Sequence, residues 1–172
     1  MRWSKQKSML EGRICDSLKG RVEFFSTRYR GTHDQEGRSW IVLDKKIVFD
    51  MCTLKWKVGY YGMTYQIRQI NDCADCLDPE QKEGYYRAYD EADQIMHKKG
   101  IFSQYQFYNA VDEYLNLSID DALKSDNILI KAFSMIDKRL GKRRLISYDT
   151  TTQHPFVQKL YQIRCEAEGI QT

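Results

Sequence analysis

The sequence has little proline and no long apolar segment. Only two prolines and ten glycines occur among its 172 residues, which argues against long linkers and low-complexity stretches. No apolar run approaches the roughly 20 residues that cross a bilayer. The basic N-terminus is not followed by an apolar segment, so a signal peptide is not expected either. We therefore expect a cytoplasmic protein without a membrane partner.

The common catalytic motifs are also missing. The sequence contains no GxSxG nucleophile turn, no phosphate-binding P-loop, no HExxH helix and no dinucleotide fingerprint. This absence favours a protein that binds over one that catalyses, without excluding an enzyme. We therefore expect no cofactor.

Cysteine is present in an odd number, and its spacing does not suit a metal site. Five widely spread cysteines without a signal peptide indicate reduced thiols. Cys73 and Cys76 form a single CxxC pair, whereas a structural zinc site needs a second pair of ligands. Cys52, His97 and His154 have no such paired spacing. We expect two incidental thiols in a loop and no metal.

The charges of the chain are segregated along its length. Residues 1–70 carry a net charge of +7, residues 71–130 a net charge of −8, and residues 131–172 a net charge of +4. Acidic helices that pack beside basic elements would average these charges out. Alternatively, the acidic middle of one copy docks on the basic ends of another, which would make the protein a homo-oligomeric interaction module.

The hydrophobic pattern predicts strands near the N-terminus and helices after them. Alternation predicts three strands, at 21–30, 38–43 and 46–52, with a tight turn at 44–45. Helical spacing and caps predict helices at 4–18, 53–70, 78–99, 103–115, 126–140 and 155–169, and an irregular segment at 142–153.

This order defines an α+β fold. We expect one domain over 1–172: an N-terminal helix, a small three-stranded antiparallel sheet, and a helical C-terminal two-thirds in which 71–172 packs on 1–70. The opening order superficially resembles a double-stranded-RNA-binding module, but only Lys55 and Lys57 represent the lysine cluster of such modules.

Two helices have specific expected features. The apolar positions of 53–70 are Leu54, Val58, Tyr61, Tyr65 and Ile70, and we expect them to form its packed face. The helix of 78–99 should begin at an Asp78 cap followed by proline.

The connection between the first two strands carries more charge than a turn requires. Its candidate site residues are Arg28, Arg30, His33, Asp34, Glu36 and Arg38. The arginines could hold a phosphate or a carboxylate through forked hydrogen bonds. His33 could act as a general base oriented by Asp34 or Glu36, as in a small hydrolase or phosphoester-processing enzyme, or the three could ligate a divalent metal. Alternatively, the two carboxylates pair with the arginines and only fix the loop.

A second basic cluster follows the predicted helix end at Gly141. Lys142, Arg143 and Arg144 lie beyond that end and could meet phosphate groups. Together with the three arginines of the first connection, they suggest a non-catalytic binding or regulatory module whose partner is nucleic acid or an acidic protein.

Several stretches resemble a family of small bacterial proteins for which no activity is established. They are His33–Ile41, Pro79–Tyr86, Asp137–Leu145, His154–Val157 and Arg164–Gly169. The resemblance covers nearly the whole chain and implies a single-domain bacterial protein. It implies no catalytic residue, substrate or ligand.

Overall fold

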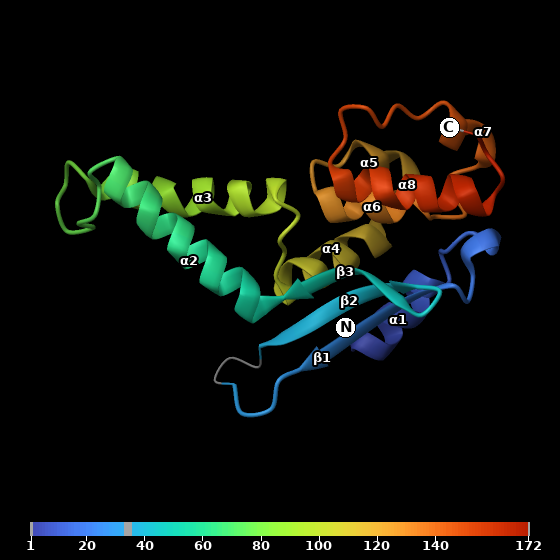
Figure 1. Ribbon diagram of the computed structural model, residues 1–172, viewed down its shortest axis with the longest axis horizontal. Coiled ribbons are helices and arrows are strands. Elements are labelled where there is room, and N and C mark those ends of the chain that lie inside the picture. Colours follow the sequence, from blue (N-terminus) through green and yellow to red (C-terminus); the bar gives the residue numbers. More distant parts are fainter. Residues whose placement is uncertain (1, 33–35, 172) are drawn as a thin grey trace.

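A computed structural model describes residues 2–32 and 36–171 of the protein (Figure 1). The elements follow in the order α1 (Trp3–Glu11), a 3₁₀ turn η1 (Asp16–Leu18), β1 (Val22–Arg28), β2 (Gly37–Leu43), β3 (Lys46–Cys52), α2 (Thr53–Ile70), α3 (Lys82–Lys98), α4 (Gln104–Asn116), α5 (Ile119–Lys124), α6 (Ile128–Met135), α7 (Lys142–Ile146) and α8 (Pro155–Ala167). The predicted α+β fold, with its N-terminal helix, three-stranded sheet and helical remainder, is confirmed.

The sheet is an antiparallel meander in the order β1-β2-β3. Val22 pairs with Leu43 at one end of β1 and Arg28 pairs with Gly37 at the other. The turn between β2 and β3 is the predicted tight one. Asp44 and Lys45 both have positive φ, 48° and 68°, as a two-residue hairpin with the right-handed twist of its strands requires.

One face of the sheet is buried by the helices that follow it. Phe24 of β1 is fully buried, and its ring meets Phe133 of α6 edge to face at 6.1 Å. Phe133 also packs against Phe107 at 6.0 Å and Tyr114 at 5.5 Å, both from α4. These contacts join the sheet and the C-terminal helices in one apolar core.

A buried carboxylate lies where α4, α8 and the chain after α6 meet. The Asp137 side chain is fully buried and accepts hydrogen bonds from the Tyr114 hydroxyl, and from the Arg139 backbone N–H at 2.7 Å and guanidinium at 2.7 and 2.9 Å. Burial is the main reason that the pKa of Tyr114 is raised. Arg164 of α8 donates to the backbone carbonyl of Asp137 at 2.6 Å. The junction therefore ties α4 and α8 to the chain after α6.

Helices α2 and α3 pack against each other and project from the rest of the molecule as a hairpin (Figure 1). They have a small apolar cluster of their own, in which Ile67, Ala88 and Ala92 are buried. Helix α2 follows β3 directly and leads away from the sheet, so the opening segment does not form the compact helix–sheet unit of a double-stranded-RNA-binding module. The α2–α3 hairpin is instead the most protruding feature of the fold.

Several predicted helix limits are wrong. The first helix ends at Glu11 instead of residue 18, because the chain then bends to place Ile14 beside Asp137 in a β-bridge. The α3 helix begins at Lys82, since the Asp78 carboxylate accepts the Glu80 N–H in a preceding turn.

The basic segment after α6 also departs from the prediction. Helix α6 covers 128–135 of the predicted 126–140, and the Asp137 junction follows it. Residues 142–146, predicted to be irregular, form the short helix α7.

Candidate docking surface on the α2 helix

Helix α2 carries two apolar stripes, and the prediction assigned the wrong one to the interior. The packed stripe is Trp56, Tyr60, Met63 and Ile67: the last three pack against α3, and Trp56 stacks on Tyr60. The expected inner positions are exposed, with relative accessibilities of 43% for Leu54, 78% for Val58, 56% for Tyr61, 64% for Tyr65 and 82% for Ile70. We call Leu54, Val58, Tyr61 and Tyr65 the outer stripe.

Helical geometry explains how both stripes coexist. Each member of the outer stripe precedes a member of the packed stripe by two residues, which is about 200° around a helix. The two stripes therefore face opposite ways. A glycine selects the packed side, since a Cβ on Gly59 would lie 2.6 Å from the Met96 methyl group of α3. The close approach of α3 at this glycine leaves the outer stripe uncovered.

The cations of α2 have no acidic counterpart on the same helix. Its 18 residues include Lys55, Lys57 and Arg68 and no aspartate or glutamate. Arg68 is used within the hairpin: its guanidinium lies 3.3 Å from the ring centre of Tyr85 and 4.2 Å from that of Tyr89. A hydrogen bond from Arg68 is the largest cause that lowers the pKa of Tyr89. The two lysines lie near the sheet, at the start of the outer stripe.

These lysines bind α2 to the end of the sheet that carries the predicted arginines. Lys57 forms an ion pair with Glu36, a buried residue of the β1–β2 connection. Lys55 lies 3.3 Å from the Asp50 carboxylate, which also accepts the Arg38 Nε at 2.6 Å. The outer stripe thus begins beside the charged end of the sheet.

A buried glutamine fixes this end of the sheet. The Gln104 amide nitrogen of α4 lies 2.7 Å from Ser26 Oγ and 2.8 and 3.0 Å from the carbonyl oxygens of Thr27 and Arg38. Next to it, the Tyr29 hydroxyl contacts Cys52 Sγ at 3.3 Å. That hydrogen bond, followed by burial, raises the pKa of Tyr29 to about 12. Gln104 was not among the predicted site residues, and its role is structural.

The structure does not bring the three arginines of the connection into one clamp. Arg38 pairs with Thr27, whereas Arg28 is the next residue of β1, so the strand alternation directs Arg28 and Arg38 to opposite faces. Arg28 lines an open cleft beside α1 and α4, Arg38 is paired with Asp50, and Arg30 is exposed after the strand end.

The second basic cluster lies at a distant end of the molecule, on α7 (Figure 1). Arg144 is paired with Asp120, and Lys142 donates to the carbonyl oxygen of Glu168 at 3.2 Å. Arg143 is exposed on the same short helix. The two basic clusters of the sequence therefore do not form one continuous surface.

The predicted catalytic or metal site is only partly described. His33 and Asp34 lie outside the described residues, while Glu36 is buried against Lys57. Within 2–32 and 36–171, no three His, Cys, Asp or Glu residues gather in a way that could hold a metal ion. In the same ranges, no helix has the length and apolar character needed to traverse a bilayer.

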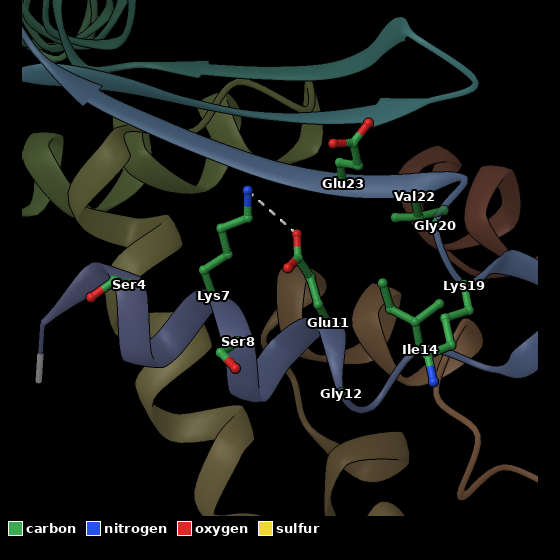
Figure 2. Close-up of a pocket in the computed structure, with 10 residues that line it drawn as sticks. All are labelled: Ser4, Lys7, Ser8, Glu11, Gly12, Ile14, Lys19, Gly20, Val22 and Glu23. Atoms are coloured by element: carbon green, nitrogen blue, oxygen red, sulfur yellow. Dashed lines mark ion pairs between the residues drawn. The ribbon is translucent and has the colours of Figure 1, made fainter.

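The groove between α1 and β1, which has a volume of about 590 Å³, differs from the outer face of α2 in its charge. Figure 2 shows Lys7 and Glu11 reaching from α1 toward β1, where their charged groups lie 3.5 Å apart. Lys19 and Glu23 add one further charge of each sign to the lining. This groove is therefore balanced in charge, unlike the outer face of α2.

The fold and the outer face of α2 define an α+β protein with a projecting helical hairpin and an exposed apolar helix face that is flanked by Lys55. A family model matches residues 2–165, and the chain belongs to the SF0329 protein family. No curated protein and no solved structure shows significant similarity to it.

Proposed function

We propose that the protein is a non-catalytic binding module that holds an acidic, amphipathic segment of another protein on the outer face of α2. The observation that carries this proposal is the outer stripe, an exposed apolar row on a helix that contains cations and no acid. Large exposed apolar patches mark interaction sites in soluble proteins. Exposed apolar side chains are concentrated on the α2–α3 hairpin, which holds seven of the twelve large ones in the described part of the chain.

The charge of the surface indicates the chemistry of the partner. Lys55, whose side chain is 75% exposed, flanks the outer stripe, and Arg30 is exposed nearby at the end of the sheet. An acidic helix with an apolar row would cover the stripe and neutralise these cations. Nucleic acid fits less well, because Leu54 and Val58 form half of the stripe and provide neither a stacking ring nor a hydrogen bond for a base.

The sequence also supports a location and a source for the proposed module. We place it in the cytoplasm of a bacterium, in keeping with the family resemblance and with five cysteines that form no disulfide. An acidic segment of a cytoplasmic protein is then the natural ligand.

Binding of two matched peptides tests the proposal. The acidic peptide is an 18-residue amphipathic helix with a leucine row flanked by glutamates, and the basic peptide has lysines in their place. We expect fluorescence anisotropy to show at least about tenfold tighter binding of the acidic peptide at low salt, declining as salt screens the charges. Equal binding of the two peptides, or no binding of the acidic one, would overturn the proposal.

Two further measurements distinguish other partners. Binding of a labelled single-stranded oligothymidine in preference to the acidic peptide would assign the surface to nucleic acid instead. Light scattering would reveal a second copy as the occupant, through a dimer that dissociates when Val58 is changed to aspartate. Either result would contradict the proposed protein ligand.

A further inference from the structure

We propose that His97 and His154 make the joint between the α2–α3 hairpin and the body of the protein sensitive to pH. In their neutral forms both rings make hydrogen bonds that hold the end of α3 in place, and protonation removes an acceptor from each. This inference concerns the attachment of the hairpin and does not depend on which partner binds α2.

Both histidines contact the same buried aromatic ring, that of Phe102, at this joint. The His97 ring, near the end of α3, stacks on Phe102 with ring centres 5.1 Å apart. The His154 ring meets the same phenylalanine edge to face at 6.4 Å. Phe102 is 5% exposed and belongs to the main core. The two histidines are therefore positioned where the hairpin joins the body.

The hydrogen bonds of Gln106 select one tautomer of the neutral His97 ring. The Gln106 side-chain oxygen accepts the Ser103 backbone N–H at 2.8 Å, as part of the capping box that begins α4. Its amide nitrogen consequently faces α3, where it donates to Asp93 Oδ1 at 2.9 Å and lies 2.8 Å from His97 Nε2. Because this nitrogen is a donor, His97 Nε2 must accept, which requires a neutral ring with its proton on Nδ1.

The start of α8 selects one tautomer of the neutral His154 ring in the same way. His154 is the N-cap of α8, and its Nδ1 accepts the Phe156 N–H at 3.1 Å. The proton of the neutral ring is then on Nε2, which lies 3.3 Å from the carbonyl oxygen of Lys98 and donates to it. One imidazole thus links the start of α8 to the end of α3.

Protonation changes both links. A protonated His97 can no longer accept from Gln106, and its Nε2–H is left with Asp93 Oδ2, 3.5 Å away on its own helix. Asp93 and Asp126, which line the same cleft, attract the imidazolium, so a bond across the joint is exchanged for one within α3.

A protonated His154 loses its cap bond to Phe156 and places a positive charge at a helix N-terminus, where it is unfavourable. The partners of its ring are an N–H group, a carbonyl and the Phe102 ring, and none of them titrates to offset that charge. Acidification that protonates these two rings should therefore loosen the hairpin.

Hydrogen exchange at pH 7.5 and 5.5 tests the inference, with rates expressed as protection factors to correct for the intrinsic effect of pH. We expect the protection of residues 97–106 and of Phe156 to fall about tenfold at pH 5.5, while α6 is unchanged. The double variant His97→Gln, His154→Asn retains uncharged groups that can accept these bonds, so its protection should not depend on pH. Equal protection of the wild type at both pH values, or the same loss in the double variant, would overturn the inference.

The nitrogen shifts of the imidazole rings give a second test that needs no variant. At pH 7.5 we expect the Nδ1–H tautomer for His97 and the Nε2–H tautomer for His154. The opposite tautomers, or protonated rings at this pH, would contradict the proposed links.

Discussion

Replacing Asp137 by alanine is expected to lower the free energy of unfolding by about 3–5 kcal/mol. The substitution removes a fully buried carboxylate and leaves the Tyr114 hydroxyl without its acceptor. Two nitrogens of the Arg139 guanidinium also lose their acceptor, while the third still donates to the Leu117 carbonyl at 2.9 Å. The buried Tyr114 hydroxyl then has no acceptor, and the Arg139 charge, 30% exposed, loses its carboxylate, so the loss exceeds that of an ordinary hydrogen bond. Urea denaturation followed by circular dichroism measures it.

An exposed ion pair provides the matched control for this substitution. Asp120 pairs with Arg144 at the surface, with side-chain exposures of 62% and 47%. Its replacement by alanine should change the free energy of unfolding by less than about 1 kcal/mol. If Asp137→Ala were as mild as Asp120→Ala, the buried junction would not hold the C-terminal helices together.

Replacing Arg164 by methionine should have the second largest effect, again a loss of about 3–5 kcal/mol. Arg164 is 3% exposed and donates to the carbonyl oxygens of Met135, Asp137 and Leu140, at 3.2, 2.6 and 2.6 Å. Methionine fills much of the same space but supplies no donor, so the carbonyls of Met135 and Leu140 lose the bond from Arg164, while that of Asp137 keeps only the Leu140 N–H at 3.0 Å.

The lysine variant separates the hydrogen bonds of Arg164 from its charge. Arg164→Lys keeps the positive charge but lacks the forked donors of a guanidinium, so we expect thermal unfolding to give a stability between those of the wild type and the methionine variant. A methionine variant as stable as the wild type would show that these carbonyls do not need Arg164.

The sheet and its turn could be predicted from the sequence, because their signals are local. Alternating apolar residues fixed the three strands, and the Asp44–Lys45 pair suited a two-residue turn. The cap residue Ser103 and the proline at the start of α8 likewise placed two helix starts correctly. Each of these features depends on a few neighbouring residues.

The packed face of α2 could not be predicted, because the choice depends on a distant helix. Both apolar stripes have helical spacing, and the contact of Gly59 with Met96, 37 positions further along the chain, decides between them. The basic segment around Asp137 was misjudged for a similar reason. Arg139 falls in the last turn of the helix predicted over 126–140, whereas its guanidinium binds a buried carboxylate that is reached only in the folded core.

The arrangement of the charges in the β1–β2 connection also could not be predicted from the sequence, because it depends on strand pairing. The sequence brings three arginines near one turn, but the pairing of Arg38 with Thr27 sends Arg28 and Arg38 to opposite faces. The four residues of the outer stripe could be recognised in the sequence, because they have helical spacing and lie beside lysines. Their lack of a covering partner within the chain is visible only in the fold.

The affinity of the acidic peptide for a Val58→Asp variant tests the central claim most directly. Val58 is 78% exposed, so the substitution leaves the fold intact while placing a carboxylate in the middle of the outer stripe. The control is Gln66→Asp, which adds the same charge at an exposed position about 100° around α2 from that stripe. We predict at least about tenfold weaker binding for Val58→Asp and a change below about threefold for Gln66→Asp. Equal affinities for the two variants would contradict docking on the outer face of α2.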